Sequence, residues 1–371
     1  MNNNKPIFVT QPDLPELKDV IPLLERIWDN KWLTNAGEFH QKLENKLAKH
    51  LGVPYISLFS NGTLALIVAL QHLKITGEVI TTPFTFVATT HSLIWNNIKP
   101  IFVDIENEYG NIDTSKIEAA ITPQTTAILA VHVFGNPVNT TEIERIAKKH
   151  NLKVIYDAAH AFGVKRNGKS ILNSGDLSIL SFHATKVFNT FEGGAIVCQD
   201  EKTKKNIDLL KNFGIQDEEN IIATGINAKM NEFQAAIGLL QLNRIDDLIK
   251  KRKLVSQKYD KEFNNVKGIR TIKKQVDIDS NFAYYPIFVD KESFGMDRDD
   301  LHEKLKRRNI FSRKYFYPLI SNIKIYKDFK SSDKSNLPTA NIIANNVLCL
   351  PIYPNLDLDT VDRIINTIIY E

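Results

Sequence analysis

The chain has 371 residues, of which 43% are hydrophobic and 24% are charged, a composition typical of soluble globular proteins rather than of disordered tails, fibres or disulfide-rich miniproteins. Its 47 Lys and Arg residues against 43 Asp and Glu residues leave a formal net charge of +4, which is small for this length and gives no support to nucleic-acid binding through bulk charge. The length allows two packed domains, or one large domain with a smaller one appended.

The cysteines and the apolar stretches indicate the cellular compartment. Cys198 and Cys349 lie far apart in apolar runs and match no metal-ligand spacing, so we predict two buried, reduced thiols and no metal site. No stretch approaches the roughly 18 apolar residues of a membrane span. Residues 1–6 lead into a stretch broken by Pro12 and Pro15, without the apolar core of a signal peptide. We therefore expect a cytoplasmic protein without a membrane partner.

In chain order, two helices come first, at 17–29 and 39–51, and we expect residues 1–50 to pack against a small C-terminal domain. From residue 51 short β-branched runs alternate with helical stretches, the pattern of a parallel sheet covered by helices. The expected strands are 55–58, 78–81, 100–103, 127–131, 153–156, 178–182 and 195–198. The expected helices between them are 63–73, 86–95, 114–120 with Asp113 as N-cap, 140–150 and 202–213. Residues 51–230 thus predict a large α/β domain with a seven-stranded, mostly parallel sheet and helices on both faces.

Beyond residue 227 the alternation of strands and helices stops. One long helix is predicted over 231–263, because Ala235, Leu239 and Leu242 begin a series of apolar residues at helical spacing. A strand at 282–289 and two more amphipathic helices complete a smaller α+β domain, so residues 231–371 are assigned to the connecting helix and this C-terminal domain.

The segment most informative about chemistry is SFHATKVFNTFEGGA, residues 181–195. A lone lysine in a loop is usually a solvated surface charge, but Lys186 lies between apolar residues at the end of a predicted parallel strand, where α/β proteins bind ligands. Burial there would lower the lysine pKa and leave a free amine able to form a Schiff base. Gly193 and Gly194, which follow, permit close backbone approach near a ligand.

Asp157 directly follows the apolar strand that precedes this segment. An aspartate in that place can cap the next helix, but next to a buried lysine it has a specific role in pyridoxal phosphate chemistry, where a carboxylate keeps the pyridine nitrogen protonated. His160, three residues further on, is placed either to bond the phenolic oxygen of such a cofactor or to be a satisfied core histidine.

Two further strand ends carry polar or aromatic residues. In SNGT, residues 60–63, Gly62 and Thr63 would present backbone N–H groups and a hydroxyl to a phosphate at a helix N-terminus, although a capped helix explains the segment equally well. It matches neither a P-loop nor a dinucleotide fingerprint. An aromatic residue of PFTFVAT, residues 83–89, can stack on a flat ring or pack in the core. Because all four signals lie at strand ends in one domain, we expect a single site.

SNGT, PFTFVAT, DAAH and SFHATK with EGGA, in this order, resemble the DegT/DnrJ/StrS family of pyridoxal-phosphate-dependent sugar aminotransferases. The resemblance continues through GINAKMNEFQAA, residues 225–236, to LPIYP, residues 350–354, and so covers nearly the whole chain. It implies a pyridoxal-phosphate-dependent transferase fold of type I. It also implies that Lys186 forms the Schiff base and shuttles the proton, that Asp157 pairs with the pyridine nitrogen, and that Phe86 stacks on the ring.

The resemblance assigns roles to the remaining cofactor residues. It places Gly62, Thr63 and Ser181 on the phosphate, and His160 beside the cofactor where many relatives have glutamine. Asn227 matches the family asparagine that reaches the phosphate of the neighbouring subunit's cofactor, which implies a homodimer with shared active sites. The family often has Tyr-Arg-Met after this asparagine, whereas this chain has Ala-Lys-Met, and since lysine lacks the planar fork of arginine the role of Lys229 is left open.

Within the family, residues 181–194, VTQP (9–12) and KWLTN (31–35) are most similar to members that act at C4 of a dTDP sugar. The implied reaction converts dTDP-4-keto-6-deoxy-D-glucose and L-glutamate to dTDP-4-amino-4,6-dideoxy-D-glucose and 2-oxoglutarate through the pyridoxamine form of the cofactor, for O-antigen or another surface glycan. We expect His183 to contact the sugar, and the aromatic-rich stretch RKYFYP, residues 313–318, with Arg313 and Tyr317, to line the nucleotide-sugar cleft. Transfer at C3, or a pyridoxal-phosphate-binding regulatory protein without turnover, are the alternatives.

Overall fold

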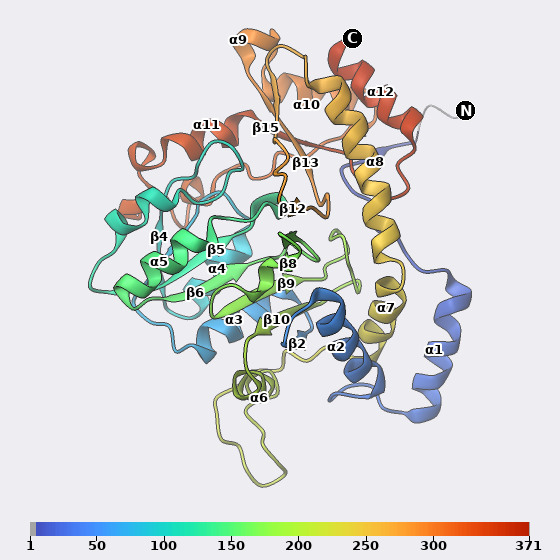
Figure 1. The fold of residues 1–371 in the computed structure, drawn as a ribbon, viewed down its shortest axis with the longest axis vertical. Helices are drawn as coiled ribbons and strands as arrows, with labels where there is room; N and C mark the ends of the chain where they lie inside the picture. Colours follow the sequence, from blue (N-terminus) through green and yellow to red (C-terminus); the bar gives the residue numbers. More distant parts are fainter. Residues whose placement is uncertain (1–4, 371) are drawn as a thin grey trace.

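The computed structural model of the protein describes residues 5–370; residues 1–4, part of the stretch from which the lack of a signal peptide is predicted, lie outside the described residues. The largest element is a seven-stranded sheet with strand order β2-β10-β9-β6-β5-β3-β4, shown in Figure 1. Its strands are β2 (Tyr55–Phe59), β3 (Glu78–Thr81), β4 (Lys99–Phe102), β5 (Thr125–Val131), β6 (Lys153–Asp157), β9 (Leu177–Ser181) and β10 (Gly194–Cys198). All seven strands predicted from the sequence are therefore present in one sheet.

The sheet is mostly parallel, as predicted. β3 pairs in parallel with β4 and β5, β5 with β6, and β6 with β9, whereas β10 runs antiparallel to both β9 and β2. The carboxyl ends of all strands except β10 consequently meet at one edge of the sheet. Because β10 returns antiparallel to β9, the connection between them, residues 182–193, turns back over this edge and carries Lys186.

Helices cover both faces of the sheet (Figure 1), because successive side chains of each strand point to opposite faces. In β10, Ile196 packs with α3 (Gly62–His72), α4 (Val87–Trp95) and α6 (Glu201–Leu210). Its neighbours Ala195 and Val197 pack on the other face with α2 (Glu38–Leu51) and α7 (Glu232–Leu242). α5 (Thr140–His150) covers the same face further along, over β5 and β6.

Three predicted helices differ from the structure. Residues 114–120 form two 3₁₀ helices, η1 (Thr114–Lys116) and η2 (Glu118–Ala120), although Asp113 caps the first as predicted, its Oδ1 accepting from the Ser115 N–H at 3.1 Å. The helix predicted at 202–213 ends at Leu210, because Phe213 and Gly214 adopt positive φ angles of 58° and 74°.

The single helix predicted over 231–263 is wrong. The chain forms α7 (Glu232–Leu242) and α8 (Ile245–Phe263), which are separated at Asn243 and Arg244. The apolar spacing continues across the break, so periodicity alone did not reveal it. Arg244 is the N-cap residue of α8, with φ −113° and ψ −10°, and its Nη1 is held by the Leu14 carbonyl at 2.9 Å and the Asp13 carboxylate at 2.8 Å.

The C-terminal part of the chain is built on a three-stranded antiparallel sheet of order β11-β13-β15. Its strands are β11 (Ile269–Thr271), β13 (Tyr285–Val289) and β15 (Val347–Leu350). Around it lie α9 (Lys291–Phe294), α10 (Arg298–Arg307), α11 (Pro338–Asn346), α12 (Leu358–Ile369) and the 3₁₀ helices η5 (Ile320–Asn322), η6 (Lys330–Ser332) and η7 (Lys334–Asn336). α8 and α12 share an apolar core with this sheet, which gives an α+β unit beside the large α/β sheet.

The N-terminal residues divide between these two units. β1 (Ile7–Phe8) pairs in parallel with β14 (Ile310–Phe311) of the C-terminal part. In contrast, α1 (Leu17–Asn30) and α2 contact the connecting helix α7, and α2 also contacts β2. The N-terminal helices thus pack against α7 and the large sheet rather than against the three-stranded sheet. The boundaries at residues 50 and 230 stay predictions.

Two smaller features complete the fold. A small sheet of order β12-β7-β8 joins β12 (Ile278–Asp279) to β7 (Lys165–Arg166) and β8 (Lys169–Ser170), and two 3₁₀ helices, η3 (Val133–Gly135) and η4 (Ile171–Asn173), lie in the large unit. Cys198 and Cys349 are buried free thiols, as predicted.

Over residues 5–370, no helix is both long enough and apolar enough to cross a bilayer.

Candidate active site

Asp157 is the last residue of β6, and only 6% of its surface is exposed. Its Oδ2 accepts a hydrogen bond from Thr89 Oγ1 at 2.7 Å, and its Oδ1 accepts one from the Ala159 backbone N–H at 3.1 Å. Burial raises the pKa of this carboxyl group, and the bond from Thr89 opposes that rise. Within residues 5–370 no cationic side chain forms an ion pair with Asp157, so a cation brought by a ligand would offset the cost of burying its charge.

Lys186 lies in the turn between β9 and β10, and its backbone N–H donates to the His183 carbonyl at 2.8 Å. Its Nζ donates to the Tyr284 hydroxyl at 3.4 Å. Burial lowers the pKa of the amine to about 8, although Asp157 and Tyr315 act in the opposite direction. Because the amine is charged below its pKa and free above it, about a tenth of it is free and nucleophilic at pH 7, far more than for an ordinary lysine. The structure thus brings the two principal predicted residues into one electrostatically coupled site.

His160 lies beside this pair and is held by two aromatic rings. It stacks on Phe316 with 5.8 Å between ring centroids, and its centroid lies 4.7 Å from that of Tyr284. Burial and the Lys186 charge hold the pKa of His160 well below its usual value, so the ring is neutral. Its Nδ1 accepts from the Phe134 N–H at 3.3 Å, and the ring proton therefore resides on Nε2. His160 can donate one hydrogen bond from Nε2 to a ligand.

The N-terminus of α3 forms a second part of the site. Asn61 caps this helix, its Oδ1 accepting from the Leu64 N–H at 2.9 Å. The backbone N–H groups of Gly62 and Thr63 have no acceptor within residues 5–370, and such groups at a helix N-terminus attract anions. Gly62 lies against the end of β9, since a Cβ added to it would be 3.1 Å from Ser181 Cβ. The predicted phosphate residues Gly62, Thr63 and Ser181 are thus neighbours.

The double glycine has a structural role at this point. A Cβ added to Gly194 would lie 2.6 Å from the carbonyl carbon of Asn61 and from the Gly62 nitrogen. Only glycine fits there, because no side chain can be accommodated between β10 and the α3 N-terminus. The close backbone approach at Gly194 is therefore to the Asn61–Gly62 backbone of the protein itself.

Phe86 and Thr89 connect the start of α4 to Asp157. Phe86 is the N-cap residue of α4 and remains 58% exposed, which is high for a large aromatic side chain. Its carbonyl accepts from the Thr89 N–H at 3.2 Å, and Thr89 in turn bonds Asp157. The ring is therefore available to stack on a flat ligand whose cationic end meets Asp157.

The predicted substrate residues are less closely grouped. His183 is partly exposed near Lys186, with its Nδ1 2.8 Å from Thr185 Oγ1 and its Nε2 3.7 Å from Glu192 Oε1. Arg313 is exposed and pairs through its backbone with Cys349. Tyr317 is 47% exposed, with its ring 4.6 Å from the Arg298 guanidinium carbon. Within the stretch 313–318, the residue that contacts His160 is Phe316 rather than Arg313 or Tyr317.

Asn227 lies apart from the other predicted cofactor residues. It is exposed in the loop that follows α6, where it forms a backbone bridge with Asn212. Over residues 5–370 no hydrogen bond or ion pair joins it to Asp157 or Lys186. The neighbouring Lys229 donates from Nζ to Asn212 Oδ1 at 2.7 Å and lies 5.0 Å from the Phe213 ring centroid. In this chain Lys229 therefore anchors the loop below α6 in Figure 1.

Sequence reasoning did not indicate Tyr284, assigned no role to Thr89, and placed Phe316 only within a stretch expected to line the substrate cleft. Thr89 stands inside the quoted PFTFVAT segment, and its spacing of three residues from Phe86 places both in the first turn of α4. No local pattern reveals Tyr284 or Phe316, because both come from the C-terminal part of the chain and reach the site only through tertiary folding.

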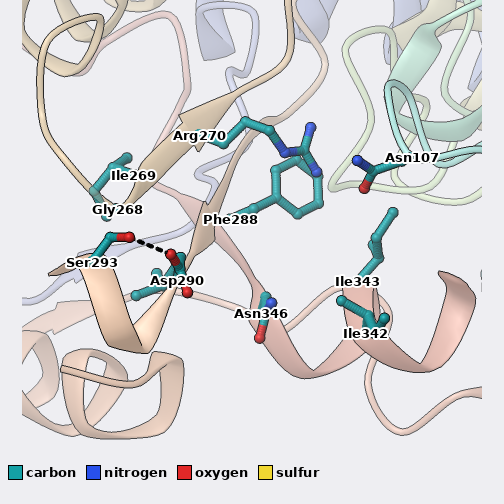
Figure 2. A pocket seen from close by; sticks show the side chains of 11 residues that line it. Asn107, Gly268, Ile269, Arg270, Phe288, Asp290, Ser293, Ile342, Ile343 and Asn346 are labelled. Atoms are coloured by element: carbon teal, nitrogen blue, oxygen red, sulfur yellow. Dashed lines mark hydrogen bonds between the residues drawn. The ribbon is translucent and has the colours of Figure 1, made fainter. Parts of the chain in front are cut away.

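A cavity of about 300 Å³ lies elsewhere, between β11, β13, α9 and α11. Figure 2 shows the Arg270 guanidinium over the Phe288 ring, with Asn107 facing this pair and Asn346 on the α11 side. The Arg270 guanidinium carbon is 3.8 Å from the Phe288 ring centroid. None of the predicted site residues lines this cavity, so it is separate from the site around Lys186.

Comparison with known proteins places these observations in a family. Residues 16–369 match the DegT/DnrJ/EryC1/StrS aminotransferase family. The chain is 53% identical over 363 residues to the dTDP-4-amino-4,6-dideoxy-D-glucose transaminase of Escherichia coli, covering 98% of each chain. It is also 53% identical over 364 residues to the protein of the same name from Shigella dysenteriae, again covering 98% of each.

Solved structures agree with this match. The crystal structure of DesI in the presence of its TDP-sugar product superposes with a TM-score of 0.93 at 32% identity, covering 98% of this chain and 92% of that one. The pyridoxal phosphate form of a putative sugar aminotransferase from Streptococcus pneumoniae superposes with a TM-score of 0.91 at 25% identity, covering 98% of each chain. The type I fold predicted from the sequence resemblance is thus confirmed.

If Lys186 carries the reactive amine, Lys186→Ala will abolish covalent capture of pyridoxal 5′-phosphate. The cofactor-free variant should show no borohydride-stable mass increase, because no other amine in the site has a pKa lowered by burial beside Asp157. Intact-mass and peptide-mass spectrometry measure the adduct. Lys99→Ala, which changes a lysine bound to Glu78 at the opposite edge of the sheet, should capture the cofactor as the wild type does. An adduct persisting on another lysine in the Lys186→Ala protein would refute the assignment.

Proposed function

This chain belongs to the DegT/DnrJ/EryC1/StrS aminotransferase family and is a sugar-nucleotide transaminase, and we propose which reaction it catalyses. We propose that it transfers the amino group of L-glutamate to C4 of dTDP-4-keto-6-deoxy-D-glucose. The products are dTDP-4-amino-4,6-dideoxy-D-glucose and 2-oxoglutarate. The choice of sugar is based on the 53% identity, over 98% of both chains, to a transaminase named for that amino sugar.

The family implies pyridoxal 5′-phosphate, and the residues of the site fit it. Asp157 is a buried carboxylate without a cationic partner among the described residues, which suits a protonated pyridine nitrogen. The free N–H groups of Gly62 and Thr63 suit a phosphate, and the exposed ring of Phe86 suits a flat aromatic ligand. When bound, this cofactor supplies an aldehyde that carries the amino group and a ring that withdraws electrons.

Proton transfer and cofactor binding are assigned to residues of the site. Lys186 Nζ, with a pKa lowered to about 8, takes the proton from the α-carbon of glutamate and later delivers a proton to C4 of the sugar. Asp157 keeps the pyridine nitrogen protonated. His160 donates from Nε2 to the phenolic oxygen, as its neutral ring and bonded Nδ1 permit. Ser181 joins Gly62 and Thr63 in holding the phosphate.

We assign the substrate contacts to His183, Tyr317 and Arg313. His183 follows β9 by two residues and, bonded to Thr185 and near Glu192, is placed to contact the sugar beside Lys186. Tyr317 lines a cavity of about 580 Å³ together with Lys327 and Lys334, whose positive charges suit a nucleotide diphosphate. Arg313, exposed at the start of the same stretch, is the further candidate for lining this cleft.

We also infer that two chains form a homodimer with shared active sites. Asn227 lies apart from the cofactor residues of its own chain, which supports a contact with a neighbouring subunit. The loop that carries it exposes apolar side chains, with Ile221 72% and Ile222 56% exposed, and an exposed apolar cluster on a folded protein marks an interface. We further propose that the product serves surface-glycan synthesis, such as that of O-antigen, and that the protein acts in the cytoplasm.

The regiochemistry is tested by supplying ¹⁵N-labelled L-glutamate and following the label. With dTDP-4-keto-6-deoxy-D-glucose as acceptor, heteronuclear NMR should locate ¹⁵N on C4 of the product. The matched acceptor is dTDP-3-keto-6-deoxy-D-glucose, which should remain unaminated. Label on C3 of this second sugar, with no reaction of the first, would overturn the C4 assignment. Failure of glutamate to convert the bound cofactor would favour a regulatory protein without turnover.

The dimer is tested by placing a charge in the exposed loop. Sedimentation should show a species of twice the 42.2 kDa chain mass for the wild type. Ile222→Glu should shift it toward the single chain, because a buried unpaired charge is costly at an interface. Ile342→Glu, at an isoleucine of α11 that is 61% exposed, should leave the dimer intact. A monomeric wild type, or a dimeric Ile222→Glu protein, would contradict the proposed interface.

A further inference from the structure

The side chain of Lys186 has a single hydrogen-bond partner within residues 5–370, the Tyr284 hydroxyl, which lies 3.4 Å from Nζ. Tyr284 immediately precedes β13 of the C-terminal unit, whereas Lys186 lies in the connection between β9 and β10 of the large sheet. We propose that Tyr284 is a positioning residue, which holds the Lys186 amine where it must take up and deliver its proton. The proposal rests on the assignment of Lys186 as the reactive amine and concerns a residue without a role in that assignment.

Three rings fix the orientation of the Tyr284 ring. Its centroid lies 4.7 Å from that of His160, 5.7 Å from that of Phe134 and 5.7 Å from that of Tyr315. The contact with Tyr315 is an edge-on arrangement at 89°, which is favourable for aromatic pairs. With its ring held on three sides, Tyr284 presents its hydroxyl at a defined point. A hydroxyl without this support would gain little from a bond as long as 3.4 Å.

The backbone before Tyr284 is also held in place, by hydrogen bonds from two buried side chains. The buried side chain of Asn281 donates from Nδ2 to the carbonyls of His160 at 2.8 Å and Phe162 at 3.0 Å, and its Oδ1 accepts from the Ala283 N–H at 3.1 Å. Asn281 therefore ties this segment to the chain that follows Asp157. The buried Arg252 adds a bond from Nη1 to the Ala283 carbonyl at 3.5 Å. The position of Tyr284 is thus set relative to the large sheet.

The chemistry of a tyrosine hydroxyl suits a lysine that changes its protonation state. Burial raises the pKa of Tyr284, so the hydroxyl stays protonated throughout the physiological range. A neutral hydroxyl accepts a hydrogen bond from the ammonium form of Lys186 and donates one to the free amine. Tyr284 can therefore keep Nζ in place before and after proton transfer, when a flexible four-carbon side chain would otherwise swing away.

The bond also affects the charge on Lys186. The titratable groups that face Nζ are Asp157, His160, Tyr284 and Tyr315. A hydrogen bond accepted from the ammonium form stabilises the charged state, so its removal lowers the lysine pKa further. Loss of the Tyr284 hydroxyl should accordingly increase the fraction of Lys186 that is uncharged at a given pH. The Lys186 amine would, however, be less well positioned for proton transfer.

The test replaces Tyr284 with phenylalanine, which keeps the ring packing and removes the hydroxyl. The matched control is Tyr285→Phe, at the next residue of the chain, whose hydroxyl bonds Asp260 Oδ1 at 2.9 Å away from the site. The first measurement is the rate at which the full-length, cofactor-free protein captures pyridoxal 5′-phosphate on Lys186 with loss of one water, followed by borohydride trapping across pH. The second is the single-turnover reaction of the cofactor-loaded protein with L-glutamate.

For Tyr284→Phe we expect the pH midpoint of capture to fall by about half a unit. We also expect the single-turnover rate constant to fall roughly tenfold while the apparent glutamate affinity stays within about twofold, because only the proton-transferring amine is displaced. Tyr285→Phe should match the wild type in both measurements. An unchanged midpoint and rate constant for Tyr284→Phe, or a loss confined to glutamate affinity, would overturn the proposal. Absence of capture by the wild type would instead refute the assignment of Lys186.

Discussion

The site depends on the burial of one carboxylate. Asp157 ends β6 inside the protein, where its charge is costly unless hydrogen bonds and a cation compensate. Thr89 and Ala159 supply the hydrogen bonds, and Lys186 supplies a nearby positive charge. Asp157 in turn raises the pKa of the Lys186 amine, against the effect of burial. Each group thus limits the pKa shift of the other. A ligand with a protonated ring nitrogen and an aldehyde would pair with the Asp157 carboxylate and, at the same time, form a Schiff base with the Lys186 amine.

The sheet makes this arrangement possible. The parallel strands bring Asp157, the α3 N-terminus and the α4 N-terminus to one edge, as expected for α/β folds. The single antiparallel strand β10 then returns the chain across that edge and places Lys186 over it. Gly194 allows this return to pass within contact distance of the Asn61–Gly62 backbone. The C-terminal unit contributes the aromatic side of the site through Tyr284 and Phe316.

The sequence was sufficient for the sheet and its principal residues, because β-branched runs and strand-end motifs are local signals. All seven strands were predicted to within two residues at each end, and Lys186, Asp157 and His160 lie together. Features that depend on tertiary contacts were not predictable. The break between α7 and α8 is held by Asp13 and Leu14, more than two hundred residues away in sequence. Tyr284 likewise reaches Lys186 through tertiary contacts, among them the hydrogen bond from Asn281 to the His160 carbonyl.

The property on which the site most depends is the lowered pKa of Lys186, because burial lowers it against the opposing effect of Asp157 and leaves about a tenth of the amine free at pH 7. Its most direct test is an NMR titration of the Lys186 side chain in full-length, cofactor-free protein, with Lys186→Ala used to assign the signal. The account predicts a midpoint at about 8. A midpoint near 10.5, the ordinary value for lysine, would contradict it.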